Sequence, residues 1–439
     1  MSYFAAALVF LLLAEAMLAA GLWKPSVDIG DPVTLIIVHC VTIGWLGLLM
    51  IGALLQFAPV LTGAGLATEC FNLPALIAIV SGLAALICGF AAIKNGSSAA
   101  ALIMPVATAL LAAGLLGIGA VLFTGLWRER SAHAAAPFVL LGIVCLAVTV
   151  LLGVCFALVL SGVTDAPLIV NLALRAVPVH AGFGLGGWMS LAAIGVSYKL
   201  MGMFLLSPDT SRTRMVLAGG ASTFLILGVA LLCLLTRRDM IEALLFISAA
   251  VFLGTIAVYA TEMRSLYRTR RRKTLELNSI GSIAAFVLLA LSMAALVISM
   301  PLNADERIRA AIAHLFVFGW LTGLGLAQLL KIVPFLTWLE AFGPLLGRRP
   351  TPRLQDLIKE RRASFWLGGF YLAVVSAAGS IAVNTDAGFQ VSALAQLICS
   401  AGLIFELFQV RILAHVDAVA KSSPFHQPGL LIAKINSER

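Results

Sequence analysis

Two histidines begin closely similar segments that are otherwise apolar. The first segment reads HCVTIGW from His39, and the second reads HLFVFGW from His314. In both, a Gly-Trp pair lies five and six residues after the histidine, and a proline lies twenty residues after it. An imidazole inside a membrane is costly without a partner, and metal ligation is its strongest use there. The repeated spacing favours a matched pair of metal ligands over the alternative, in which each imidazole only hydrogen-bonds a neighbouring helix.

A third Gly-Trp pair, Gly187 and Trp188, lies between the other two. Its histidine, His180, precedes the glycine by seven residues, and Gly182 occupies the position that matches His39. Spacings of 143 and 132 residues between the three pairs predict three equivalent four-helix units. We place these units at about residues 1–130, 131–262 and 263–420.

The elements that position these histidines are apolar helices. Hydrophobic residues make up 61% of the 439-residue chain and charged residues 11%, against about a quarter charged in soluble domains. Most apolar runs reach the ~20 residues needed to cross a bilayer. We therefore predict an all-α polytopic protein, a single integral membrane domain over 1–439, in contact with the lipid bilayer. Its twelve spans are predicted at 4–23, 33–57, 74–93, 99–126, 136–162, 177–204, 214–236, 241–261, 279–300, 309–335, 364–383 and 391–413.

The net charge of +9 would suggest nucleic-acid binding in a soluble chain, but here the basic residues gather in short loops. We exclude nucleic acid as a partner for that reason. Sixteen lysines and arginines follow even-numbered spans and seven follow odd-numbered ones, which predicts that both termini are cytoplasmic. The predicted location is a bacterial inner membrane, with residues 340–363 as a cytoplasmic loop.

Haem is the metal group that best suits two equivalent histidines. Histidine is a common haem ligand, and two facing helices can supply both axial positions of one iron. We predict His39 and His314 as that pair. Two further sets of side chains are predicted to contact the cofactor: Trp45 and Trp320 against the macrocycle, and Arg307 and Arg309 with the propionates. The alternatives are plain aromatic packing and arginines that reach lipid headgroups.

Here the sequence resembles a known family. Twelve spans, cytoplasmic ends, a threefold repeat and histidines near the outer ends of spans two, six and ten are similar to the large subunit of haem-copper oxidases and nitric oxide reductases. The spacing of His314, Gly319 and Pro334 is most similar to span ten of the nitric oxide reductases. The resemblance implies that His39 and His314 hold a low-spin haem b. It also implies that His180 corresponds to the single copper ligand of span six. Copper is a weaker second cofactor, because one histidine makes a poor copper site and a buried, hydrogen-bonded imidazole is the favoured alternative for His180.

The sequence departs from this family at its catalytic centre. Ile312 stands where the family's catalysts have the histidine of the active-site haem, and Gly184 stands where many oxidases have a tyrosine. Span seven, MVLAGGASTFLILGVALLCLL, lacks the two histidines that the family uses for copper. We therefore expect a divergent member without the binuclear centre, and we assign no catalytic residue. Whether the chain is an enzyme stays open, but a complete oxidase or nitric oxide reductase is not expected.

The expected function is electron transfer, or handling of nitric oxide or a similar ligand, rather than oxygen reduction. A cytochrome c, a quinol or another subunit of a respiratory complex would be the partner. Two alternatives stay open. The first is a haem or copper trafficking protein that uses His39, His180 and His314 as a transient site. The second is a cofactor-free membrane scaffold in which the repeat serves packing alone.

Overall fold

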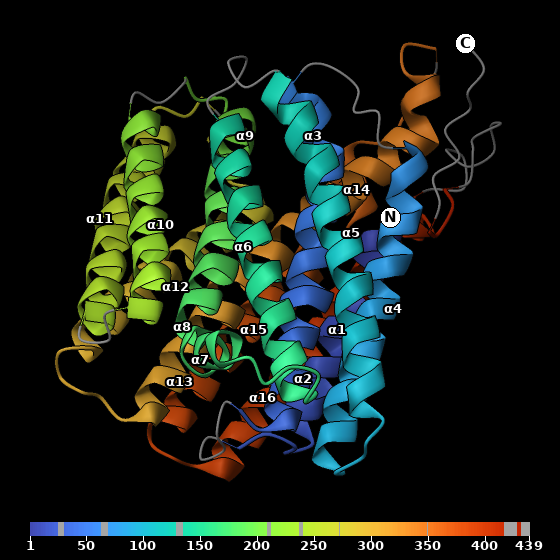
Figure 1. The fold of residues 1–439 in the computed structure, drawn as a ribbon. Helices are drawn as coiled ribbons and strands as arrows, with labels where there is room; N and C mark the ends of the chain where they lie inside the picture. The colour runs from blue at the N-terminus through green and yellow to red at the C-terminus, as the bar shows by residue number, and fades with distance from the viewer. Residues whose placement is uncertain are drawn as a thin grey trace. The chain divides into compact units, whose positions relative to one another are not determined.

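The computed structural model describes residues 1–24, 30–62, 69–128, 135–208, 212–236, 240–271, 273–348, 350–416 and 428–431. These residues are almost entirely helical, and no strand occurs among them (Figure 1). The helices are α1 (Ser2–Ala19), α2 (Pro32–His39), α3 (Leu48–Thr62), α4 (Glu69–Lys94), α5 (Ala100–Arg128), α6 (Ala136–Leu160), α7 (Pro167–Arg175), α8 (Val177–Ala181), α9 (Ala192–Leu205), α10 (Thr213–Thr236), α11 (Ile241–Arg268), α12 (Leu277–Ser299), α13 (Glu306–His314), α14 (Gly323–Phe342), α15 (Glu360–Ala382) and α16 (Asp386–Arg411).

Twelve helical runs within the described residues are long and apolar enough to cross a membrane. This confirms the predicted all-α class with twelve spans, so the chain is a polytopic membrane protein whose outer surface contacts the lipid bilayer. Residues 340–363, predicted as one loop, include the end of α14, a 3-10 turn at Leu354–Leu357 and the start of α15.

The chain forms two compact units. Unit 1 comprises Met1–Ser26, Leu275–Leu289 and Glu306–Arg439, and unit 2 comprises Val27–Thr274 and Ala290–Asp305. Within unit 2, α4 packs along α5 and α10 packs along α11; within unit 1, α15 packs along α16. The three predicted four-helix repeats stay a prediction.

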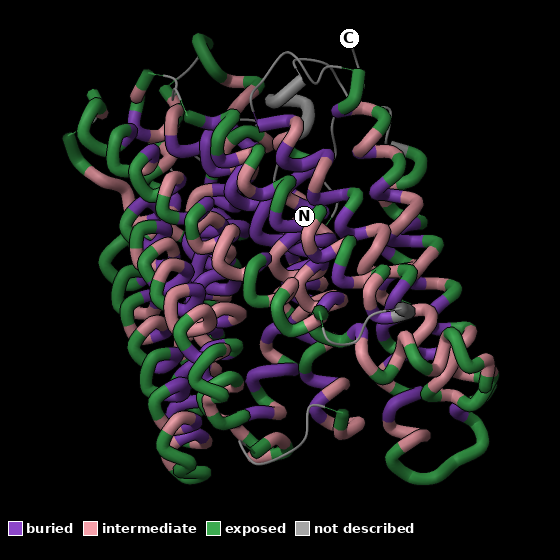
Figure 2. Tube along the Cα trace, turned by 60° about the vertical axis from the view of Figure 1, so that its left-hand side comes forward, coloured by how far each residue is buried: buried purple, intermediate pink, exposed green. Residues whose placement is uncertain are grey.

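Three spans are interrupted by π-helical segments, and these are the spans that carry the Gly-Trp pairs. The segments are Cys40–Gly47 between α2 and α3, Gly182–Leu191 between α8 and α9, and Leu315–Thr322 between α13 and α14. The same three spans are the most buried, with 67%, 61% and 67% of their apolar windows covered, against 44% or less in the other spans described. Along most helices in Figure 2, buried residues alternate with exposed ones. π-helical turns are rare and concentrate at functional sites. The repeated motif thus has a repeated and largely buried local structure.

The glycine of the second Gly-Trp pair permits close helix contact in the π-helical segment Gly182–Leu191 of unit 2. A Cβ on Gly187 would lie 2.6 Å from both Cβ and Sγ of Cys145 on α6. We expect Gly187→Ala to lower the free energy of unfolding by about 1–3 kcal/mol, because the helices must separate. The matched control is Gly202→Ala on α9, where a Cβ would meet no atom of the described residues within 4 Å. Titration with SDS in mixed micelles measures the free energy of unfolding of both variants. Equal values for the two would contradict the packing argument.

Candidate functional site

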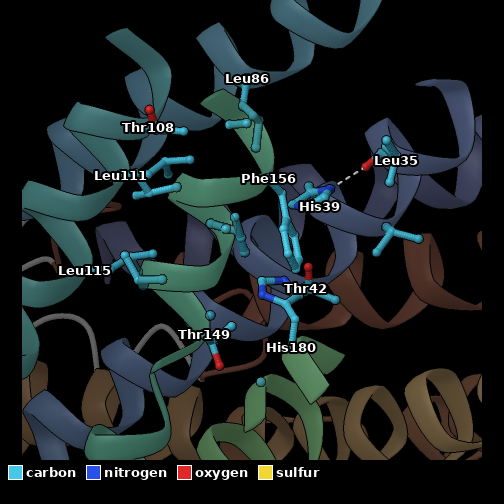
Figure 3. A pocket seen from close by; sticks show the side chains of 18 of the residues that line it. Leu35, His39, Thr42, Leu86, Thr108, Leu111, Leu115, Thr149, Phe156 and His180 are labelled. Atoms are coloured by element: carbon cyan, nitrogen blue, oxygen red, sulfur yellow. Dashed lines mark hydrogen bonds between the residues drawn. The ribbon is translucent and has the colours of Figure 1, made fainter. Parts of the chain in front are cut away.

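His39 is the last residue of α2, directly before a π-helical segment. The helix begins at an Asp31 cap, whose carboxylate accepts hydrogen bonds from the backbone of Val33 and Thr34, and Pro32 occupies its first position. At the other end, the Nδ1 atom of His39 lies 2.7 Å from the Leu35 carbonyl oxygen (Figure 3). That carbonyl can only accept, so Nδ1 carries the proton and Nε2 keeps its lone pair. A backbone carbonyl on one ring nitrogen is the usual support for a histidine whose other nitrogen binds a metal.

A cavity of about 250 Å³ lies beside His39 within unit 2, and His180 lines it as well. Figure 3 shows the two imidazoles on the same cavity, with Phe156 near them. The rest of the lining is almost wholly apolar. The structure therefore brings together two of the three predicted histidines in one cavity.

His180 is presented by α8, which Gly182–Leu191 continues as a π-helix. Its Nδ1 atom is buried and makes no hydrogen bond within the described part of the chain. The Phe156 ring packs on it, with 5.2 Å between ring centroids. An unpaired buried nitrogen of this kind costs about 1–3 kcal/mol, which marks it as a site for a partner absent from the protein itself.

His314 ends α13 in the same way, directly before the π-helical segment Leu315–Thr322. The residue is buried, and its Nε2 atom has no hydrogen-bond partner among the described residues. Phe318 and Phe389 pack around the ring, with centroids 4.7 and 6.1 Å away. His314 belongs to unit 1, whereas His39 and His180 belong to unit 2. The pairing of His314 with His39 therefore stays a prediction.

A buried polar cluster in unit 1 includes residues that the sequence did not single out. Gln396 and Ser400 on α16 donate hydrogen bonds to Oε1 of Glu15 on α1, at 2.9 and 3.0 Å. Gln396 and Ser400 lie four residues apart, so they share a helix face. In the sequence, this cluster was indicated only by two polar residues four positions apart within an apolar span.

The other residues predicted to contact the cofactor are two tryptophans and two arginines. Trp45 and Trp320 are fully buried, each within a π-helical segment. Arg307 lies seven residues before His314 on α13, which at 100° per residue places it on the same helix face, about 10.5 Å along the axis. Arg309 lies five residues before His314, about 140° around the helix. The helix therefore favours Arg307 over Arg309 as a neighbour of any group bound at His314.

Within the described residues, no three histidine, cysteine or acidic side chains cluster closely enough to hold a metal ion. The free nitrogens of His39, His180 and His314 instead suit a group that brings most of its own ligands, as a porphyrin does for iron. A comparison with models of known protein families and with curated protein sequences finds no match to this chain. Any functional assignment therefore depends on the site itself.

Proposed function

We propose that the chain is a membrane haem b protein in which His39 and His314 supply the two axial ligands. One observation carries this proposal: both histidines end an α-helix directly before a π-helical segment that contains Gly-Trp. Two imidazoles held by the same local structure at the same register are suited to equivalent roles. The proposal also places the protein in a bacterial inner membrane with both termini in the cytoplasm.

The side chains fit such a group in three ways. His39 has its Nδ1 proton fixed on a backbone carbonyl, so its Nε2 is free to bind iron. The Nε2 atom of His314 is buried and has no hydrogen-bond partner among the residues that the structure describes, which a bound iron would remedy. Arg307, on the face of His314, would pair with a propionate.

This ligand set favours electron transfer. A haem with two protein ligands supplies a one-electron redox centre and has no open position for a substrate at iron. The protein would hold the iron in an apolar, water-poor environment, which the buried Trp45 and Trp320 help to form. A cytochrome c, a quinol or a neighbouring respiratory subunit would exchange electrons with it.

A reduced-minus-oxidised absorption spectrum of the purified protein tests the proposal. We expect sharp bands of a low-spin b-type haem that carbon monoxide does not shift, since both axial positions are occupied. Protein isolated without haem should be reconstituted with it before the measurement. A folded sample that takes up no haem would overturn the proposal and leave metal trafficking or a scaffold role.

A further inference from the structure

The uncharged lining of the cavity in unit 2 determines which kinds of ligand can bind there. Among the described residues that line it, none is an aspartate, glutamate, lysine or arginine. An ion placed there would lose its hydration without gaining a charged partner, which costs several kcal/mol. The cavity therefore suits a neutral molecule and excludes a free metal ion, a phosphate or a fatty-acid carboxylate.

The polar atoms that do line the cavity mostly accept hydrogen bonds. The proton on Nδ1 of His39 goes to the Leu35 carbonyl, so Nε2 is an acceptor. The hydroxyl hydrogens of Thr108 and Thr149 are used on carbonyls of their own helices, at 3.0 and 2.8 Å. The buried Nδ1 of His180 has no hydrogen-bond partner within the described part of the chain. It accepts when the ring proton lies on Nε2, where the backbone of Thr149 can take that proton. A ligand that satisfies this lining must donate hydrogen bonds, as hydroxyl groups do.

Aromatic rings back both imidazoles. Phe156 packs on His180 at 5.2 Å and Phe90 packs on His39 at 5.3 Å, in tilted geometry. Such rings favour a flat aromatic ligand, which they can contact by offset or edge-to-face packing. The volume of about 250 Å³ exceeds the roughly 150 Å³ of an apolar cavity that admits benzene, so it accommodates one substituted ring.

The ligand would enter from the bilayer. Three of the lining residues, Val38, Leu160 and Val177, are also exposed at 38%, 48% and 41%. In a membrane protein such exposed apolar side chains face lipid. A ligand with an apolar tail could therefore keep the tail in the bilayer while its ring occupied the cavity.

We propose that this cavity binds a lipid-soluble hydroquinone, with ring hydroxyls donating to Nδ1 of His180 and Nε2 of His39. The inference concerns binding and goes beyond the proposed haem. If iron takes Nε2 of His39, the acceptor on His180 remains. The uncharged lining and its acceptor atoms call for a neutral donor, the phenylalanine rings favour a flat ring, and the exposed apolar lining leaves room for a tail.

Calorimetric titration of the full chain in phosphatidylcholine nanodiscs, with no haem added, tests the inference. The probe is a benzohydroquinone with a decyl tail, kept reduced, and its dimethyl ether is the matched ligand without donors. Protein-free nanodiscs correct for partition into lipid. We expect saturable binding of the hydroquinone, with the ether at least tenfold weaker, as the loss of a hydrogen bond predicts.

Three variants locate the binding site. His180→Phe keeps a planar ring without the acceptor and should weaken binding about tenfold, while His180→Asn keeps a polar atom near Nδ1 and should weaken it less. Ala181→Trp should fill the cavity and abolish binding. Leu225→Ala, on the exposed face of α10, is the control that should leave affinity unchanged.

The inference is overturned if the ether binds as well as the hydroquinone, if binding is absent, or if Ala181→Trp leaves it intact. Because the titration uses protein without added haem, a failed haem reconstitution does not affect the result. A photoreactive azido-hydroquinone supplies an independent readout. It should label peptides of the helices that line the cavity, α2, α4, α5, α6 and α8, and labelling confined to helices that do not line it would equally overturn the assignment.

Discussion

Replacing His39 or His314 by alanine is expected to abolish the low-spin haem spectrum, whereas His180→Ala is expected to retain it. Each of the first two changes removes one axial ligand of the proposed pair, and an alanine methyl cannot bind iron. His180 supplies no axial ligand in this proposal, so its loss should change only the cavity in unit 2. The measurement is the haem content per protein together with the reduced-minus-oxidised spectrum.

Free imidazole gives this experiment a control that separates ligation from folding. Truncation of a buried histidine leaves a space of about the size of imidazole, so added imidazole should restore the low-spin bands to a variant that is folded. The contrary pattern is also informative. Loss of haem in His39→Ala and His180→Ala, with retention in His314→Ala, would assign the ligands to the two imidazoles that share one cavity.

A second large effect is expected at a buried ion pair in unit 1. Nη2 of Arg411, at the end of α16, lies 2.5 Å from Oε2 of Glu340 on α14, and Nη1 donates to the Thr337 hydroxyl at 3.1 Å. Both ion-paired side chains are at least nine-tenths buried, and Arg411 also donates to the Gly429 carbonyl. Arg411→Met should lower the free energy of unfolding by about 3–5 kcal/mol, because it leaves the Glu340 carboxylate buried without its partner.

The double variant Arg411→Met/Glu340→Met is the matched comparison. Replacement of a whole buried pair by apolar side chains is often close to neutral, so the double variant should be more stable than Arg411→Met alone. SDS titration in mixed micelles compares them. Burial, and next the charge of Arg411, lower the pKa of the Met1 amine, so that pKa should rise in Arg411→Met. A double variant less stable than the single one would show that the pair is not the source of the effect.

Hydropathy was sufficient to predict the twelve spans, because runs of about 20 apolar residues have few other uses. The π-helical segments were not predictable in the same way. An apolar run such as LFVFGWLT has no polar face whose period would reveal a change from i→i+4 to i→i+5 bonding. The repeated Gly-Trp pairs indicated which positions in the three spans are equivalent, but they did not indicate that the backbone there is π-helical.

The partners of the histidines were the least predictable part of the site. Spacing along one helix fixes which residues share a face, but it does not fix which helices meet. His39 and His180 are 141 positions apart, and only the packing of unit 2 places them on one cavity. Likewise, Gln396 is one of three glutamines in α16, and only the fold brings Glu15 to it.

The π-helical segments also limit how this protein can change in length. An i→i+5 turn holds one more residue than an i→i+4 turn, so a deletion inside the π-helical segment can be taken up by a return to α-helical bonding that keeps the flanking helices in register. A deletion in the α-helical part of the span of His314 would instead turn everything beyond it by about 100° and draw it back about 1.5 Å, away from the helices it now touches. Changes of length in these spans are therefore expected to concentrate in the π-helical segments over evolution.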